Sequence, residues 1–301
     1  MSAIEVPSVP QGPEPASELV LVLRAEGRAA SRWYRQPALM AGIVILAIVV
    51  GMAVAAPLIT SYDPIAQNLN ESLLGPSAHH WLGTDQLGRD TWSRLLYGGR
   101  TDLQIAFIAV LLPFVLGTII GSVAGYFGGW VDIVIMRLVD IVVAFPFFVL
   151  IIALVFVLGP GERSIYIAIT LVGWVSYARI IRGQILVAKR QEYVAAAQSG
   201  GLSPVRIIAR HLLPNVISQA IVYALSIDIV QDILAIVTLS YLGLGIQPPA
   251  PDWGTMISDG QNFLTTHWQL TTIPGLAVVV TGLGLSLLAD GLADLLRLGQ
   301  S

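Results

Sequence analysis

The sequence predicts an all-α integral membrane protein with about six transmembrane helices. Hydrophobic residues make up 55% of the 301-residue chain and charged residues only 12%, whereas a soluble domain carries about 25% charged residues. Several uncharged segments are close to the ~20 residues that a helix needs to cross a bilayer. The chain therefore lacks the charge to cover a water-exposed surface. Its long apolar segments suit the interior of a bilayer instead.

The composition also excludes several functions. The net charge is −3 and there is no cysteine, so we expect no nucleic-acid partner, no disulfide and no thiolate metal site. The single lysine, Lys189, is followed by Arg190, but a phosphate-binding Walker A loop needs Gly-Lys-Ser or Gly-Lys-Thr. If ATP drives this protein, another chain must bind it. We expect no cofactor on this chain.

Residues 1–36 are rich in proline at first and then basic. Their only apolar run, Leu19–Leu23, is too short for the core of a signal peptide. We predict a cytoplasmic tail. Residues 37–102 are expected to form the first transmembrane helix, within the uncharged Ala38–Ile59, and then an external loop, Ser61–Asp102.

The external loop is predicted to contain one helix, within Asp85–Tyr97. Thr84 or Asp85 would cap its start, and Gly98-Gly99 would end it. The neighbouring His79 and His80 do not form a metal site with Asp85 in our interpretation, because adjacent histidines point apart in most backbones. A role in the loop or at the start of the helix is preferred.

Residues 103–298 are expected to form the core of the transmembrane domain. Five further spans are visible in it: Leu103–Phe127 with Pro113 as a tolerable kink, Ile141–Leu158, Ser164–Ala178 with an extension past Arg179, Val216–Leu242, and Ile273–Ala289. A second external segment, Gly243–Thr272, is rich in proline and glycine.

The distribution of basic residues predicts the orientation. With the N-terminus inside the cell, twelve basic residues lie at or near the cytoplasm and four lie outside, which satisfies the positive-inside rule. The twelve are Arg24, Arg28, Arg32, Arg35, Arg137, Arg179, Arg182, Lys189, Arg190, Arg206, Arg210 and Arg297, and the four are Arg89, Arg94, Arg100 and Arg163. Both termini are therefore predicted to be cytoplasmic.

The longest internal connection is Arg179–Leu213, and its loop over residues 189–214 carries a helix–turn–helix pattern. A helix is expected over Glu192–Ser199, and Gly200-Gly201 would end it because glycine tolerates positive φ. Ser203 and Pro204 would start a second helix that runs to a break at Leu213-Pro214. The segment could rest on the membrane surface as an amphipathic connector, or its small residues could dock into a groove of a partner chain.

Ionisable residues in or beside the predicted spans form two pairs. Asp228 and Asp232 are four residues apart and share one helix face, so they either line a solute path or form a buried pair bonded to another helix, with Gln231 as a neighbour. Arg137 and Asp140 are three residues apart, and we expect them to form a structural bridge.

Several segments of the chain resemble one family of transport proteins. The internal loop is similar to the EAA loop of binding-protein-dependent ABC importer permeases at Glu192, Ala196, Ala197, Gly201, Leu213 and Pro214. Three further segments resemble the C-type permease subunit of the dipeptide, oligopeptide and nickel importers. These are His80–Asp90 with Ser93-Arg94, Gly128–Asp132 with Arg137–Asp140, and Leu239–Gly245 with Gln247-Pro248-Pro249 and Trp253-Gly254.

The resemblance implies a type I ABC importer permease fold in the cell membrane of a prokaryote. It implies a homologous second permease that shares the translocation path, cytoplasmic ATPase subunits that bind ATP and Mg²⁺, and an external solute-binding protein. The residues that it assigns to ATPase coupling are Glu192, Tyr193, Ala196, Ala197, Gly200, Gly201, Leu202, Ser203 and Pro204.

The resemblance makes this chain a non-catalytic subunit that imports peptides or a related small solute. A proton-coupled secondary transporter that uses Asp228 and Asp232 is the main alternative. A membrane-bound enzyme is a weaker alternative, because the chain has no Gly-x-Ser-x-Gly elbow and no His-Glu-x-x-His helix.

Overall fold

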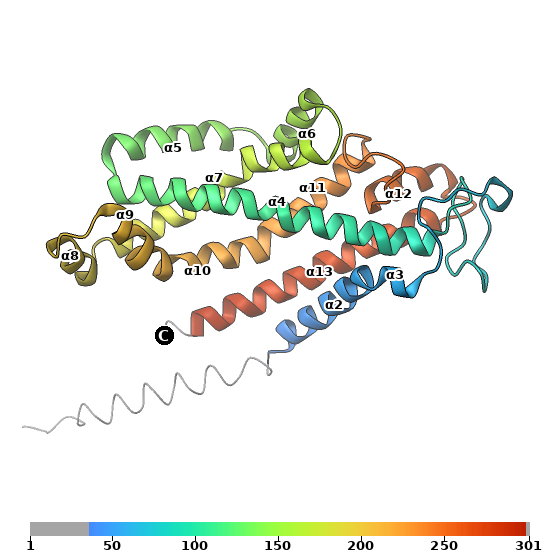
Figure 1. Cartoon of the computed structure of the whole chain (residues 1–301), viewed down its shortest axis with the longest axis horizontal. Helices are drawn as coiled ribbons and strands as arrows, with labels where there is room; N and C mark the ends of the chain where they lie inside the picture. Colours follow the sequence, from blue (N-terminus) through green and yellow to red (C-terminus); the bar gives the residue numbers. More distant parts are fainter. Residues whose placement is uncertain (1–35, 299–301) are drawn as a thin grey trace, which may run out of the picture.

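The apolar segments fold into long helices that lie side by side along one axis, as a computed structural model shows (Figure 1). The structure describes residues 36–298, without the side chains of residues 225, 226 and 294–298. The predicted tail therefore lies almost wholly outside the described residues. Within 36–298 the secondary structure is helical, apart from one isolated β-bridge between Thr84 and Asp90.

Residues 36–298 form twelve α-helices, which Figure 1 labels in chain order. They are α2 (Pro37–Val54), α3 (Ala56–Ile59), α4 (Thr91–Phe127), α5 (Gly129–Val143), α6 (Phe147–Leu158), α7 (Glu162–Ala188), α8 (Glu192–Ser199), α9 (Pro204–Ile207), α10 (Leu213–Tyr223), α11 (Ile229–Tyr241), α12 (Trp253–Gly260) and α13 (Gln269–Leu298).

Four of these helices are long and apolar enough to cross a membrane: α2, α4, α7 and α13. The bent pair α5 and α6 adds a fifth span if the two helices are counted together. The remaining predicted span, Val216–Leu242, corresponds to α10 and α11, which a π-helical turn at Ala224–Asp228 joins. The count of six spans therefore stays a prediction.

A helix is present within Asp85–Tyr97 as predicted, but its predicted start and end were both wrong. Asp90 caps the helix, with Oδ2 accepting from the Ser93 amide at 2.8 Å, and α4 then continues through Gly98 and Gly99 to Phe127. A Cβ on Gly99 would lie 2.6 Å from the indole of Trp253, and one on Gly98 would lie 3.1 Å from Asp252 Cα. These glycines leave room for the start of α12 to pack against α4, and they do not end the helix.

The third predicted span, Ile141–Leu158, is not one straight helix. It breaks at Ala144–Pro146, and α5 and α6 meet at an angle of 88°. Pro146 explains the break, because the residue before a proline is disfavoured in the helical region. In contrast, the expected extension of Ser164–Ala178 past Arg179 is confirmed, since α7 runs to Ala188.

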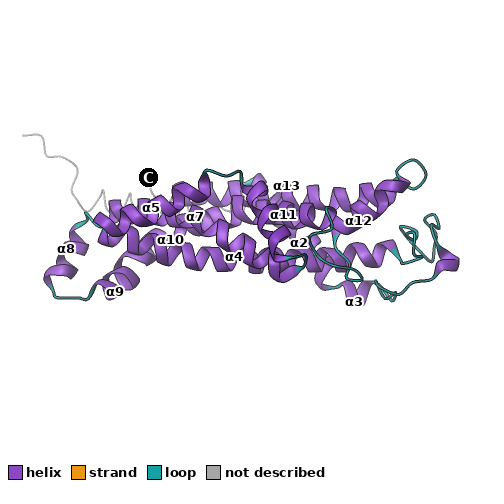
Figure 2. Ribbon diagram, turned by 90° about the horizontal axis from the view of Figure 1, so that it is seen from above, coloured by secondary structure: helices purple, strands orange, loops and turns teal. Residues whose placement is uncertain are grey.

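The helices place two sets of short segments at opposite ends of the bundle (Figures 1 and 2). One end carries α8 and α9, and α13 runs back toward this end. The other end carries α3, α12 and the loops between α3 and α4. The segment with the EAA pattern and the two predicted external segments are thus separated by the length of the bundle.

Candidate functional site

The turn between α8 and α9 is the centre of the candidate site. Gly201 has φ +74°, whereas Gly200 has φ −74°. The Gly201 amide donates to the Gln198 carbonyl at 3.0 Å, and the Leu202 amide donates to the Ala197 carbonyl at 3.3 Å. These two bonds form the Schellman motif that ends many helices. The expected positive φ is therefore confirmed for Gly201 only.

One face of this helix–turn–helix is anchored to the bundle. Val194, Ile207 and Leu212 are at most 1% exposed, and Ala197 is also buried. They belong to an apolar cluster that includes Ile181 and Ile185 of α7 and Val216 of α10. This burial fixes α8 and α9 against the ends of the long helices.

The other face is exposed and consists mostly of small and apolar groups. Of the predicted coupling residues, Leu202 is half-buried and Ala197 is buried, and the exposed ones are Glu192, Tyr193, Ala196, Gly200, Gly201, Ser203 and Pro204. Val205 is 75% exposed on the same segment and was missed by the sequence analysis. An apolar residue directly after the Ser-Pro helix start was the signal that could have found it.

The second helix of the segment differs from the prediction in two respects. Ser203 and Pro204 start α9 as expected, but the Ser203 side chain makes no capping hydrogen bond. The predicted break at Leu213-Pro214 was wrong, because a π-helical turn at Ile208–Leu212 leads directly into α10. Proline is tolerated there because it occupies the first turn of α10.

Two contacts tie the ends of the long helices together close to the candidate site. Arg182 of α7 donates Nη2–H to Asp132 Oδ2 of α5 at 2.6 Å, and the Arg182 Nε–H also contacts Asp132 Oδ1. Lys189 donates to the Tyr126 carbonyl and lies 5.5 Å from the centre of its ring. These contacts join the end of α7 to α4 and α5.

Glu192 makes no ion pair with Arg206 or Arg210 within the part of the chain that the structure describes. Its side chain is exposed at the first turn of α8.

The two aspartates of the predicted solute path are buried inside this chain. Asp228 is 3% exposed and accepts a hydrogen bond of 2.6 Å from the Tyr177 hydroxyl of α7. Asp232 is fully buried, and neither of its carboxylate oxygens has a hydrogen-bond partner. Gln231 is half-buried beside them. The structure brings Asp228 and Asp232 together, with Tyr177 as a partner that the sequence did not indicate.

The predicted pair of Arg137 and Asp140 is formed, but it lies on the outside of the chain. Arg137 Nη1 is 3.9 Å from Asp140 Oδ2, and the two side chains are 78% and 68% exposed. An exposed ion pair of this kind contributes about 0–1 kcal/mol.

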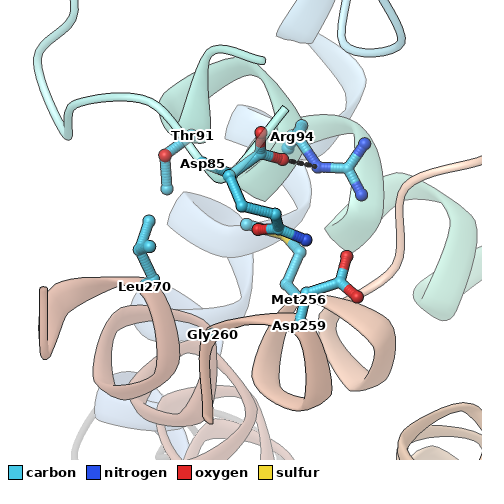
Figure 3. A pocket seen from close by; sticks show the side chains of 8 residues that line it. Asp85, Thr91, Arg94, Met256, Asp259, Gly260 and Leu270 are labelled. Carbon is cyan, nitrogen blue, oxygen red and sulfur yellow. Dashed lines mark ion pairs between the residues drawn. The ribbon is translucent and has the colours of Figure 1, made fainter. Parts of the chain in front are cut away.

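The far end of the bundle carries a buried network of charged side chains. Asp85 accepts from Arg89 Nε–H at 2.6 Å, and Arg94 Nε lies 3.5 Å from the same carboxylate (Figure 3). Arg89 also donates to Asp259 of α12 at 3.2 Å. The loop before α4 is thereby joined to α12.

Two groups at this end have roles at helix starts. His80 Nδ1 is 2.8 Å from Oδ1 of Asp90, the cap of α4, which places His80 at the helix start as preferred. Asp252 caps α12 by accepting from the Thr255 amide at 3.0 Å. Burial raises the pKa of the Asp252 carboxyl, and the hydrogen bonds from Thr255 act against this increase.

Comparisons with known proteins assign the chain to a family. Residues 117–299 match the model of the binding-protein-dependent transport system inner membrane component, and residues 27–76 match the N-terminal transmembrane domain of oligopeptide transport permease C. The chain belongs to the binding-protein-dependent transport system inner membrane components. It is a multi-pass membrane permease subunit of the ABC importer type.

Curated relatives cover most of the chain. The dipeptide transport system permease protein DppC of Bacillus subtilis is 41% identical over 85% of this chain and 80% of the relative. The oligopeptide permease OppC of the same organism is 39% identical, over 85% of this chain and 84% of the relative. The glutathione permease GsiD of Pectobacterium atrosepticum is 38% identical over 88% of both chains.

A solved structure supports the fold. A chain of the MetNI methionine ABC transporter, in an inward-facing conformation, matches with a TM-score of 0.51 and 16% identity, over 68% of this chain and 96% of that chain. The predicted all-α, type I importer permease fold is therefore confirmed.

Proposed function

We propose that this permease imports peptides or a related small solute and is driven by cytoplasmic ATPase subunits that dock on α8 and α9. The names of the relatives support the solute class, since they are permeases for dipeptides, oligopeptides and glutathione. Because this chain has no Walker A loop, ATP and Mg²⁺ are bound by the partner subunits. The family assignment leaves the proton-coupled alternative without support.

The observation that carries the proposal is the two-sided α8–α9 segment. Its inner face is anchored in the bundle through Val194, Ile207 and Leu212, while its outer face presents Tyr193, Ala196 and the Gly201 turn. Small residues let a backbone approach a partner groove closely. Movement of a docked ATPase is therefore transmitted to α7 and α10, which tilts the helices between inward-open and outward-open states.

Two further partners belong to the proposal. A homologous second permease completes the solute path, and an external solute-binding protein docks at the end that carries α3 and α12 (Figure 1). The α8–α9 end and both termini are cytoplasmic in this proposal, in agreement with the arginine distribution.

The test is the Gly201→Val variant in the purified complex. A β-branched residue at φ +74° is strained by about 1–3 kcal/mol, and the space around Gly201 is open, so the change alters the turn and not the bundle. We expect the spans to insert normally, with loss of ATPase co-purification or of coupled solute uptake. The measurements are ATPase content of the purified complex and uptake into proteoliposomes.

The matched control is Gly159→Val. Gly159 also has positive φ (+90°) and open space around it, but it follows α6 at a distance from α8 and α9. It should bear similar backbone strain and retain ATPase binding. If Gly201→Val keeps both ATPase content and uptake at the level of this control, the coupling assignment is wrong.

A further inference from the structure

The junction between α4 and the start of α12 buries two carboxyl groups close together. Asp102 of α4 and Asp252, the residue before α12, are both 0% exposed. Asp252 adjoins α4 at Gly98, where a Cβ would lie 3.1 Å from Asp252 Cα, and Asp102 follows about one helical turn later on α4. The Trp253 amide donates to Asp102 Oδ2 at 3.0 Å. The start of α12 is thus bonded to α4 through a buried acid.

The two carboxyl groups differ in their hydrogen-bond partners. Both oxygens of Asp252 accept bonds, Oδ1 from the Thr255 amide at 3.0 Å and Oδ2 from the Thr255 hydroxyl at 2.6 Å. The Ser240 hydroxyl also donates to Asp252. In contrast, Asp102 Oδ2 accepts from the Trp253 amide, while Asp102 Oδ1 is buried with no hydrogen-bond partner among the described residues. Asp252 is therefore equipped to carry a negative charge, and Asp102 is not.

The charged groups around the junction do not neutralise Asp102. Among the described side chains it has no ion pair, and Arg94 on the same helix lies 3.5 Å from Asp85. Helix α2 and residues 269–289 of α13 carry no charged residue. The other charged residues of α4, α7, α11 and α12 are exposed or belong to the clusters described above: Arg100, Glu162, Arg163, Arg179, Arg182, Asp232 and Asp259. Asp252 is the charged group that acts on Asp102, and a like charge disfavours a second carboxylate.

A buried acid without a cation keeps its proton, because an unpaired buried carboxylate is costly. Since Asp102 Oδ2 already accepts from the Trp253 amide, the proton lies on Oδ1. We infer that Asp102 is a neutral carboxylic acid that holds α12 on α4, and that loss of its proton at alkaline pH weakens this junction. Two buried carboxylates, Asp102 and Asp252, would then repel each other. Both residues belong to this chain, so the junction does not depend on the proposed function.

The pH dependence of stability tests for the proton. A carboxyl group that stays protonated in the fold, but ionises near pH 4 in the unfolded chain, stabilises the fold fully at low pH and less as the pH rises. Asp102→Asn is neutral at every pH and keeps an oxygen for the Trp253 amide. Between about pH 5 and pH 9, the thermal midpoint of the purified wild-type complex should therefore fall relative to that of Asp102→Asn.

The control for this titration is Asp63→Asn, which replaces an exposed acid. Its midpoint should differ from that of the wild type by the same amount across the pH range. A constant difference for Asp102→Asn as well would overturn the inference. Because asparagine is the isostere of the neutral acid, failure of Asp102→Asn to fold would also overturn it.

Infrared spectroscopy detects the proton directly. At neutral pH, the difference spectrum between the wild-type complex and Asp102→Asn should contain the C=O stretching band of a protonated carboxyl group. The corresponding spectrum for Asp252→Asn should contain the loss of a carboxylate band. An exchanged pattern, or no acid band for Asp102→Asn, would contradict the assignment.

Hydrogen–deuterium exchange shows whether the proton holds α12 in place. At one alkaline pH, the amides of α12 (Trp253–Gly260) should exchange faster in the wild-type complex than in Asp102→Asn. Equal exchange in the two proteins would show that ionisation of Asp102 does not weaken the junction.

Discussion

Single residues in the bundle show how a polar group is accommodated at membrane depth. The Tyr177 hydroxyl of α7 donates to Asp228, in the π-helical turn that joins α10 and α11. Tyr177 itself is fully buried, and the centre of its ring lies 5.4 Å from that of Phe114 and 5.3 Å from that of Tyr223. This geometry favours the buried-pair interpretation of Asp228 and Asp232 over an open solute path within this chain. The bond joins α7 to the turn between α10 and α11.

Removing the hydroxyl group should therefore destabilise the permease. In Tyr177→Phe, a buried carboxylate loses its donor, which costs about 1–3 kcal/mol. We expect a lower thermal midpoint for the purified complex. Tyr166→Phe is the matched control, because the Tyr166 hydroxyl bonds to an exposed Glu162. A midpoint equal to that of the control would show that the bond contributes no stability.

At the scale of elements, the contact between α4 and α7 organises the bundle. Gly117, Gly121 and Gly125 follow one another at intervals of four on α4 and face α7. A Cβ on Gly117 would lie 2.3 Å from the Trp174 carbonyl oxygen, and one on Gly121 would lie 2.5 Å from that of Ala178. Small residues at this spacing let membrane helices approach until their backbones touch.

A larger side chain at the centre of this contact should separate the two helices. Gly121→Leu places its side chain against the Ala178 backbone, which cannot move away without displacing α7. Overpacking of this kind costs about 1–3 kcal/mol or more. We expect a strong decrease in the yield of folded, monodisperse permease, measured by gel filtration in detergent.

The control for this variant is Gly51→Leu on α2, where the space around the glycine is open. It adds the same side chain to another membrane helix, so it should keep the normal yield. Equal yields for the two variants would mean that close α4–α7 packing is not required.

At the scale of the whole molecule, the two ends of the bundle define the topology. The α8–α9 segment and the α3–α12 end are separated by the length of the long helices (Figure 2). Since the proposed coupling function needs α8 and α9 inside the cell, the α3–α12 end must be outside.

The absence of cysteine from the chain makes this orientation measurable. Ser199→Cys and Ser61→Cys each introduce one thiol at an exposed position, at opposite ends of the bundle. In intact cells, a membrane-impermeant maleimide should label residue 61 and leave residue 199 unlabelled until the cells are lysed. The reverse pattern would overturn the N-in, C-in topology and place α8 and α9 outside.

The sequence by itself determined the helical membrane class, the extension of α7 and the turn at Gly201. Each depends on local properties: the length of an apolar segment, the charge that it lacks, and the positive φ that glycine adopts without strain. The glycine spacing on α4 was also present in the sequence, and the sequence analysis missed it.

Only the tertiary structure decided what distant residues do to one another. Gly98 and Gly99 read locally as a helix stop, yet they lie inside α4, where Asp252 and Trp253, more than 150 positions away in the chain, pack against them. One of the two interpretations of Asp228 gave it a partner on another helix, but only the approach of α7 to the turn between α10 and α11 showed that this partner is Tyr177. The local sequence pattern indicates which secondary structure a segment can form. Which residues bury a side chain or bond to it depends on how elements far apart in the sequence pack together.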